Sequence, residues 1–358
     1  MVKEVLIAEE LELEAVQERL TSWFAGKMPQ ASELALSPLQ RPGGGSSNKT
    51  FLVELRFRQD GEMRVENLVI RWVPRDFSLF PKYDMKEQFS LMEQLEKTAI
   101  PVPRTRWFEE DESVLGVPFY IVDQVLGWLP GDRPPYHVAG PLYEATPEVK
   151  AKIWWDAVDT MAKIHTLDWE RAGLGFLGVP EGGTDALERQ IAYYEKMLRM
   201  NEEAPPPILA ATGDWLRGNI YVPKHISLCW GDARMANLIY SGDNVTAVLD
   251  WEMAFIGDPE SDLGWFLHLD WATSEGHPYS PSPRLEGLPG VKETLAYYER
   301  VTNRKVENFF YHEVFATWRL AVVCTRVEKI QRYSSLSKKT PGYITWPLFE
   351  KLQNLLGL

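Results

Sequence analysis

Two carboxylates and one amide, separated by short intervals, are the residues of this chain best suited to chemistry. Asp232 precedes Asn237 by five positions, and Asp250 follows the apolar run 245–249. A phosphoryl-transfer site needs this combination. One carboxylate accepts the proton of a hydroxyl, while an amide oxygen and a second carboxylate hold the magnesium that bridges the nucleotide phosphates. Acidic residues dominate the stretch 232–262, so an enclosed site there would require a bound cation.

The spacing predicts a role for each polar side chain of this stretch. Asp232 is expected to act as the base, and Asn237 to offer its carbonyl oxygen to Mg²⁺. Arg234 could reach the transferring phosphoryl group and offset its negative charge. Asp250 would coordinate the metal from the other side. Glu252, two positions further on, could bind a second ion or hold a metal-bound water.

The elements that must position these residues change in kind along the chain. The first third reads as a small sheet carrying one helix. An amphipathic helix is predicted around residues 11–24 and another around 85–95. An alternating run, 51–57, predicts a half-buried strand. The Asp60-Gly61 pair predicts a turn into a second strand at 67–72, and a further strand is predicted at 119–125.

Beyond residue 126 helical patterns prevail, over 153–167, 187–199, 291–301 and 313–332. The clear strands there, 226–229, 238–240 and 245–249, surround the acidic motif. Proline-rich stretches at 131–147, 204–223 and 276–290 predict loops. The predicted fold is therefore α+β and two-lobed. A small β-rich nucleotide-binding lobe with a leading helix (1–125) precedes a large helical lobe (126–358) that carries catalysis and substrate binding.

Composition narrows the class of protein. The chain of 358 residues is 45% hydrophobic and 25% charged, which is ordinary for a globular protein. A net charge of −13 argues against nucleic-acid binding. Two cysteines, Cys229 and Cys324, are too few and too far apart for a disulfide scaffold or a zinc site. The acidic beginning of the chain and the lack of a long apolar run predict a cytoplasmic protein that does not enter membranes.

The motif resembles the catalytic core of the aminoglycoside phosphotransferase family, whose pattern is H-G-D-x-x-x-x-N followed by a strand and then D-x-E. Trp230-Gly231-Asp232, Asn237 and Asp250-Trp251-Glu252 match that pattern. Further along, 257–259 and 262–263 match the family's G-D-P-x-x-D-L. The chain is most similar to the branch that includes the kinase-like domains fused to some acyl-CoA dehydrogenases. The resemblance implies a protein-kinase-like fold.

The resemblance also extends into the first lobe. A glycine and serine cluster at 43–48 stands where the family's phosphate loop lies, although it is not a regular G-x-G-x-x-G. Arg71 falls where protein kinases use a lysine to hold the α- and β-phosphates, and Glu87 falls where the partner of that cation lies. Residues 123–127 resemble the linker whose backbone binds adenine. The implied nucleotide contacts are Gly44, Gly45, Ser46, Asn48, Arg71, Glu87, Asp123 and Val125.

Structural roles compete with these functional ones. Asp232, Asn237 and Asp250 could cap turns, and Glu252 could form a structural ion pair. Asp258 and Asp262 are predicted to be structural: their carboxylates would cap a helix that starts near Leu263 or bond its backbone. His165 is read as a core histidine, and Trp230, where the family has histidine, as a packing substitution. The glycine cluster could be a turn that binds no ligand, and Arg71 could form an ordinary surface ion pair with Glu87. Five aromatic residues are expected mainly in the core: Trp128, Tyr194, Trp265, Trp271 and Trp318.

The sequence as a whole predicts a phosphotransferase that uses ATP, with GTP as an alternative, and Mg²⁺. The acceptor would be a hydroxyl on a small molecule, either an aminoglycoside or a hydroxylated acyl or other metabolite. A catalytically silent nucleotide-binding module is a rival interpretation. A metal-dependent hydrolase is less favoured, because histidine ligands are missing from the motif. The oligomeric state is not defined by the sequence.

Overall fold

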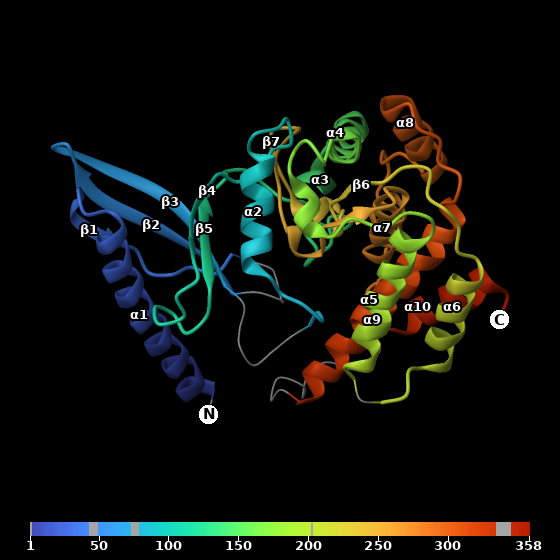
Figure 1. Ribbon diagram of the computed structural model, residues 1–358, viewed down its shortest axis with the longest axis horizontal. Helices are drawn as coiled ribbons and strands as arrows, with labels where there is room; N and C mark the ends of the chain where they lie inside the picture. Colours follow the sequence, from blue (N-terminus) through green and yellow to red (C-terminus); the bar gives the residue numbers. More distant parts are fainter. Residues whose placement is uncertain (1, 43–48, 73–78, 202, 334–344) are drawn as a thin grey trace. The chain divides into compact units, whose positions relative to one another are not determined.

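The structure is a computed structural model that describes residues 2–42, 49–72, 79–201, 203–333 and 345–358. Figure 1 labels the helices and most of the strands. Contacts along the chain divide it into two compact units. The first comprises Met1–Ser78, Tyr83–Glu93 and Pro103–Val125, and the second comprises Leu79–Lys82, Gln94–Val102 and Leu126–Leu358.

The first unit is built on one antiparallel sheet of five strands in the order β1-β2-β3-β5-β4. The strands are β1 (Ser32–Leu36), β2 (Lys49–Gln59), β3 (Glu62–Trp72), β4 (Thr105–Glu109) and β5 (Phe119–Asp123). The predicted turn joins β2 to β3: Gln59 pairs with Glu62. Asp60 and Gly61 both adopt positive φ, of 53° and 83°. That combination defines the tight hairpin turn that Asp-Gly favours.

Helix α1 (Val2–Lys27) covers one face of this sheet, because the alternating residues of β2 all point toward it. Phe51 and Leu55 are fully buried there together with Phe24 of the helix. The alternation in the sequence therefore identified the core face correctly. Helix α2 (Met85–Leu95) brings Phe89 to the sheet, where its ring lies 6.2 Å from that of Tyr120.

The second unit is mainly helical and carries two small antiparallel sheets, β6 with β9 and β7 with β8. Its strands are β6 (Ser227–Cys229), β7 (Leu238–Ser241), β8 (Asn244–Val248) and β9 (Phe255–Gly257). Its α-helices are α3 (Pro141–Glu144), α4 (Pro147–Thr166), α5 (Asp185–Arg199), α6 (Pro207–Gly218), α7 (Glu260–Ala272), α8 (Val291–Thr302), α9 (Phe309–Tyr333) and α10 (Trp346–Leu356).

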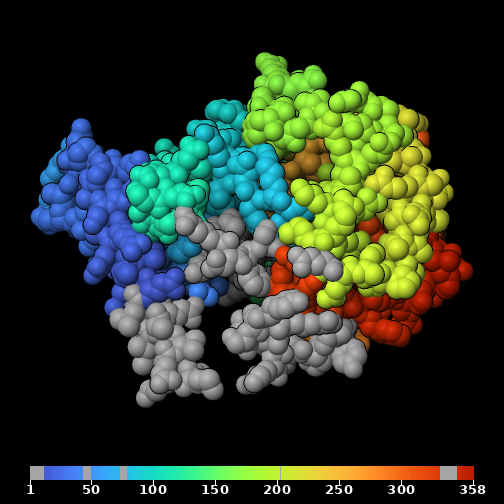
Figure 2. All heavy atoms as spheres, turned by 60° about the horizontal axis from the view of Figure 1, so that its bottom comes forward, coloured from blue at the N-terminus to red at the C-terminus, as the bar shows by residue number. Residues whose placement is uncertain are grey.

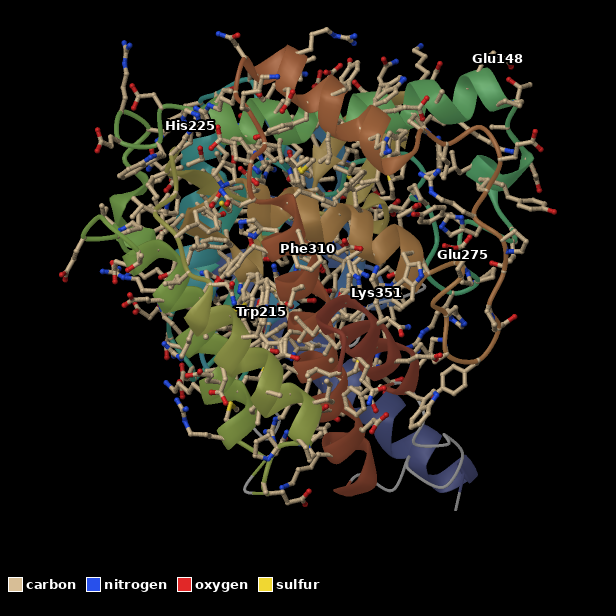
Figure 3. All side chains as sticks on the ribbon, turned by 90° about the vertical axis from the view of Figure 1, so that its right-hand side faces the viewer. Glu148, Trp215, His225, Glu275, Phe310 and Lys351 are labelled. Carbon is tan, nitrogen blue, oxygen red and sulfur yellow. The ribbon has the colours of Figure 1, made fainter. Side chains whose placement is uncertain are left out.

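Helix α7 forms the centre of this unit, since its residues from Glu260 to Asp270 are all buried. It packs on α9, which also contacts α5, α6 and α10. Trp215 of α6 meets Phe310 of α9 with ring centroids 5.8 Å apart (Figure 3). At the surface, the yellow-green region of α5 and α6 borders the red C-terminal helices (Figure 2). Helix α9 is thus the common partner of α5, α6, α7 and α10.

Several predicted boundaries need correction. The proline-rich stretch 204–223, expected to be a loop, contains helix α6, and 131–147 contains the short helix α3. Both helices carry proline in their first turn, where it costs no hydrogen bond. Strands β1, β4 and β9 and helix α10 were not predicted. The three strands have five residues or fewer, too short for a clear pattern.

None of the helices in the described ranges is long and apolar enough to span a membrane.

Glu109 of β4 supplies a pH-dependent contact between the sheet and α1. Its carboxylate accepts a hydrogen bond from Trp23 Nε1 at 2.7 Å and pairs with Lys27 Nζ at 3.0 Å. Burial would raise the pKa of this carboxyl, but Trp23, the Asp111 backbone N–H and Lys27 together lower it to about 2. The resulting stabilisation is present above the ordinary pKa and is lost as pH falls through about 2.

We therefore expect Glu109→Gln to lower the free energy of unfolding at pH 7 by roughly 1–2 kcal/mol, less than the full pKa shift would give because solvent screens the pair with Lys27. The difference from wild type should shrink as the pH falls from 5 toward 2, because the wild-type carboxylate then becomes neutral as well. Urea unfolding at pH 7 and at pH 2.5 measures this, with the exposed Glu110→Gln as control. A difference that is equal at both pH values would contradict the assignment.

Candidate active site

In the segment between β6 and β7, every second side chain packs into the core. Ala233 and Met235 are buried, while Asp232 and Arg234, which alternate with them, are only partly covered. Arg234 is extended, with φ −158° and ψ 155°, before a single 3-10 turn at Met235–Asn237. This alternation presents the polar residues on one side of the loop and anchors the loop on the other.

Gly231 permits a close approach that no other residue could make. Its φ is +86°, and a Cβ atom built on it would lie 1.9 Å from the backbone oxygen of Met253. Met253 belongs to the turn that follows Asp250. The glycine therefore brings the loop of Asp232 against the segment after β8.

Asp232 is held through both carboxylate oxygens. Trp265 Nε1 donates a hydrogen bond to Oδ1 at 2.8 Å. Oδ2 accepts bonds from Asn237 Nδ2 at 2.7 Å and Arg234 Nε at 3.0 Å. Asn237 Nδ2 also donates to the backbone oxygen of Asp232 at 3.1 Å. Because the Asn237 nitrogen serves Asp232, its carbonyl oxygen points elsewhere and remains the acceptor of that side chain.

Arg234 lies between two carboxylates. Besides Asp232, it pairs through Nη1 with Asp132 Oδ2 at 2.5 Å. Burial lowers the pKa of its guanidinium, but the charges of Asp232, Asp132 and Asp250 raise it by more, so the net shift is upward. Asp250 is therefore close enough to act on the same cation. The positive charge of Arg234 thus partly neutralises the negative charges of Asp232, Asp132 and Asp250.

Asp250 is placed by the β7–β8 hairpin. Leu238 pairs with Val248, and the backbone N–H of Leu249 donates to the oxygen of Asn237 at 2.9 Å. The next residue, Asp250, adopts a left-handed conformation with φ 60° and ψ 62°, which ends the strand and opens a 3-10 turn, Trp251–Met253. The hairpin thus sets Asn237 beside the residue that precedes Asp250. Glu252 follows inside that turn and is partly covered.

Asp262 secures the backbone in front of Asp232. Its carboxylate, fully buried, accepts bonds from the backbone N–H groups of Trp230 at 2.6 Å and Gly231 at 3.0 Å. Oδ2 also meets His165 Nε2 at 3.0 Å, and His165 Nδ1 meets the hydroxyl of Tyr298 at 2.8 Å. The structural readings of Asp262 and of His165 as a core histidine are confirmed.

Asp258 and Trp230 likewise have structural contacts. Asp258 Oδ1 accepts the backbone N–H of Glu260, where α7 begins, at 3.0 Å. Its Oδ2 accepts the hydroxyl of Tyr221 at 2.5 Å and meets His312 Nε2 at 3.4 Å. Trp230 is 1% exposed, and its Nε1 donates to the backbone oxygen of Leu249. Trp230 therefore packs under the site.

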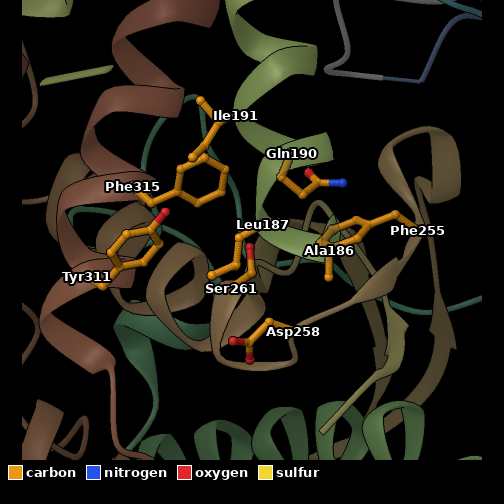
Figure 4. A pocket seen from close by; sticks show the side chains of 9 residues that line it. All are labelled: Ala186, Leu187, Gln190, Ile191, Phe255, Asp258, Ser261, Tyr311 and Phe315. Atoms are coloured by element: carbon orange, nitrogen blue, oxygen red, sulfur yellow. The ribbon is translucent and has the colours of Figure 1, made fainter. Parts of the chain in front are cut away.

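A crevice beside Asp258 is lined mainly by apolar side chains of α5 and α9 (Figure 4). Its lining residues are Ala186, Leu187, Gln190, Ile191, Phe255, Asp258, Ser261, Tyr311 and Phe315. It is too narrow to admit a water molecule. This crevice therefore belongs to the packing of the helices and offers no room for an acceptor.

The predicted nucleotide contacts belong to the first unit. Arg71 lies on β3 opposite Thr50 and Tyr120 of the neighbouring strands. Glu87 stands in the first turn of α2. Asp123 ends β5, and its Oδ1 lies 3.4 Å from Arg106 Nε. Val125 lies two positions after Asp123 and is partly covered. Gly44, Gly45, Ser46 and Asn48 lie outside the described residues.

Three residues that contact the motif were not assigned to it from the sequence. Asp132 lies in a stretch predicted to be a loop, with no pattern to single it out. Trp265 is buried, as predicted for a core residue, and its indole nitrogen also donates to Asp232. Arg319, near the middle of α9, donates to the backbone oxygen of Gly231. An arginine within an otherwise apolar helical pattern was the one available signal, and it went unused.

Comparison with known proteins places the chain in a family. The model of the phosphotransferase enzyme family, APH, matches residues 38–289, so the chain belongs to that family. The mouse protein acyl-CoA dehydrogenase family member 10 is 27% identical over 317 residues, which cover 86% of this chain and 28% of the mouse protein. The chain spans between 28% and 35% of the length of the curated relatives it matches.

Solved structures agree with this assignment. A candidate aminoglycoside phosphotransferase from Ralstonia eutropha is 25% identical, with a TM-score of 0.70 over 95% of this chain and 98% of that one. A thermostable aminoglycoside phosphotransferase in complex with ADP and hygromycin B has a TM-score of 0.50 at 15% identity, over 94% and 98%. The second likeness shows the fold alone. The predicted α+β, kinase-like fold and the family resemblance are confirmed.

The contacts of Asp262 predict a large loss of stability on neutralising it. Each carboxylate oxygen of Asp262 accepts one backbone N–H group, Oδ2 from Trp230 and Oδ1 from Gly231. Asp262→Asn replaces one of these oxygens by an NH₂ group, so that a donor then faces a backbone donor. We expect the free energy of unfolding to fall by roughly 2–4 kcal/mol, as for other buried groups that lose their partners. Urea unfolding measures this. Asp243→Asn, in the β7–β8 turn, weakens only a surface ion pair with Lys152 and should cost less than about 1 kcal/mol. Equal losses of stability in the two variants would contradict the assignment.

Proposed function

We propose that this chain transfers the γ-phosphoryl group of ATP, or alternatively of GTP, to a hydroxyl group of a small molecule. The observation that carries the proposal is the convergence on Asp232, where Asn237, Arg234 and Trp265 all donate to its carboxylate and Asp250 lies near Arg234. Membership of the phosphotransferase enzyme family supports the same reaction class. So does the binding of ADP by a protein of the same fold.

Asp232 is the proposed base. A carboxylate offers about four lone-pair sites, and the three side-chain donors leave room on Oδ1, which accepts only from Trp265 among the described residues. The acceptor hydroxyl would donate there. Its oxygen attacks the γ-phosphorus as the proton passes to Asp232, and the bond from phosphorus to the β-phosphate oxygen breaks to release the nucleoside diphosphate.

The oxygens of Asn237 and Asp250 suit Mg²⁺, which prefers hard oxygen ligands and takes the rest from phosphates and water. The orientation of Asn237 supports this choice, because its nitrogen is engaged by Asp232 and its carbonyl oxygen is left to bind a cation. The described residues contain no group of three or more His, Cys, Asp or Glu that could hold a metal. When bound, the ion would neutralise charge on the nucleotide phosphates.

Roles are also proposed for Arg234 and, separately, for residues of the first unit. Arg234 uses Nε and Nη1 for two carboxylates, which leaves Nη2 for the transferring phosphoryl group. Arg71 and Glu87, with the glycine cluster at 43–48, are proposed to position the phosphates. The backbone from Asp123 to Val125 is proposed to meet the nucleotide base. Residues 1–125 would then form the nucleotide-binding lobe and 126–358 the catalytic and substrate-binding lobe.

The acceptor is proposed from the relatives. The curated proteins that match are acyl-CoA dehydrogenase family members, which favours a hydroxylated acyl compound or related metabolite over an aminoglycoside. ADP release measured across hydroxyacyl compounds, sugars, amino alcohols and aminoglycosides distinguishes these classes. Kanamycin resistance of an expressing strain is a quick first test. Nucleotide binding without turnover on any acceptor, or in water, would favour the silent module.

Asp232→Asn should abolish the proton transfer and leave nucleotide binding intact. We expect kcat to fall by roughly 10²- to 10⁴-fold, the usual contribution of a general base. The Kd for ATP should change less than about threefold, because the base bonds the acceptor rather than the nucleotide. ADP release and calorimetry measure the two quantities, with Asp243→Asn as control. Turnover within a factor of a few of wild type would refute the assignment of the base.

Asp250→Asn should weaken metal binding selectively. We expect the Mg²⁺ concentration for half-maximal binding of a fluorescent ATP analogue to rise at least about tenfold, equivalent to ~1.4 kcal/mol. Glu252→Gln is the matched comparison, since it removes a neighbouring carboxylate. If Glu252→Gln raises this Mg²⁺ concentration less than Asp250→Asn does, Asp250 is the metal ligand and Glu252 has a structural role. No rise for Asp250→Asn would exclude it from the metal site.

A further inference from the structure

Arg319 is a buried cation whose surroundings are unusual. The residue is 1% exposed, near the middle of α9. Among the residues that the structure describes, no carboxylate forms an ion pair with it. A buried charge without such a partner is unfavourable for stability, so its presence calls for another role.

The guanidinium instead contacts a backbone oxygen and two aromatic rings. Nη2 donates to the oxygen of Gly231 and lies 3.8 Å from the sulfur of Met253. Nε and Nη1 find no hydrogen-bond acceptor within the described ranges. The guanidinium carbon lies 4.0 Å from the ring centroid of Trp265 and 5.2 Å from that of Tyr194. The electron-rich ring faces therefore take the place of a carboxylate.

Both contacts lead to Asp232. Gly231 is the residue directly before it in the chain. Trp265 donates its indole N–H to Asp232 Oδ1 at 2.8 Å. A cation on the face of the indole draws electron density from the ring, and this strengthens the N–H as a donor. Arg319 thus acts on the carboxylate through a backbone bond on one side and through a polarised indole on the other.

The hydroxyl of Tyr194 lies close enough to Arg319, Asp232 and Asp262 for the charges of all three to act on its pKa. Burial raises the pKa of its hydroxyl to about 12, with Arg319 lowering it and Asp232 and Asp262 raising it. The positive charge of Arg319 therefore opposes the negative charges of the loop inside the same buried region. This is the charge balance expected of a cation that supports a carboxylate cluster without pairing to any one member.

We propose that Arg319 is a positioning residue for phosphoryl transfer, holding Gly231 and, through the ring of Trp265, fixing Asp232 Oδ1. The inference rests on the proposed role of Asp232 as the base. Arg319 is buried against the loop through Gly231, so we do not expect it to touch substrate or nucleotide. Its removal should therefore change the rate of transfer more than the binding of either substrate.

The kinetic experiment compares Arg319→Met, Arg319→Lys and Trp265→Phe in the full chain. We expect Arg319→Met to lower kcat by roughly 10- to 100-fold, with the KM for ATP within about twofold, because only the orientation of the base is disturbed. Arg319→Lys keeps the charge over the ring and should recover part of the loss. The double variant Trp265→Phe with Arg319→Met should lose less than the product of the single losses, since both act on one bond.

Arg284→Met is the matched control. Arg284 also places its guanidinium over an indole, 5.0 Å from the ring centroid of Trp154, within the same unit. Its partners are Asp270 and the backbone oxygens of Leu288 and Pro289, none of which contacts Asp232. We expect this variant to lose stability and keep its kcat. A stability loss for Arg319→Met with unchanged kcat would make Arg319 merely structural and overturn the proposal.

An NMR measurement without nucleotide gives a readout independent of turnover. The indole N–H signal of Trp265 is identified by its disappearance in Trp265→Phe. We expect it to move upfield in Arg319→Met, as its hydrogen bond to Asp232 weakens, and to stay in place in Arg284→Met. A signal that stays unchanged in both variants overturns the proposal. Should Arg319→Met fail to fold, Arg319→Lys supplies the same comparison, with a smaller shift expected.

The two proposals fail in different ways. If Asp232→Asn keeps its turnover, the base assignment is wrong, whatever Arg319 does to the indole signal. If Asp232→Asn is inactive while Arg319→Met has normal kcat and a normal indole signal, the proposed function stands and Arg319 has no part in it.

Discussion

One buried carboxylate, that of Asp262, holds the backbone on which the rest of the site depends. It accepts the N–H groups of Trp230 and Gly231, and so ties the start of α7 to the end of β6. Three residues further along α7, Trp265 reaches Asp232. A single helix therefore fixes both the backbone before the proposed base and one of its oxygens. Buried ionic groups seldom stabilise a fold by much, yet they specify one arrangement when every partner is satisfied.

Two arginines balance the negative charge of the site, one on each side of the loop that carries Asp232. Arg234 balances Asp232 and Asp132 at the surface of the loop, with Asp250 close by. Arg319 opposes the negative charge from beneath. The loop is thereby held between two cations, one paired with carboxylates and one seated on aromatic rings. Preorganised charge of this kind is the main means by which phosphoryl transfer is accelerated.

The fold was predictable where a periodic pattern was long. The alternation of β2, the Asp60-Gly61 turn and the helices α2, α4, α5, α8 and α9 were all recovered from the sequence. Helix α6 was missed because its prolines suggested a loop, although proline in the first turn of a helix is tolerated. The strands β1, β4 and β9 are too short for a clear pattern, and β9 is paired by β6, a strand on the far side of the acidic motif.

The sequence by itself determined which residues were candidates and what family they belonged to, because the spacing of Asp232, Asn237 and Asp250 is set along one short stretch of chain. Tertiary structure alone decided what supports them. Asp132, Trp265 and Arg319 come to this stretch from other parts of the second unit, and nothing local marks their contacts. A hydrogen bond between residues far apart in sequence depends on how helices pack, and packing is a property of the whole fold rather than of any segment.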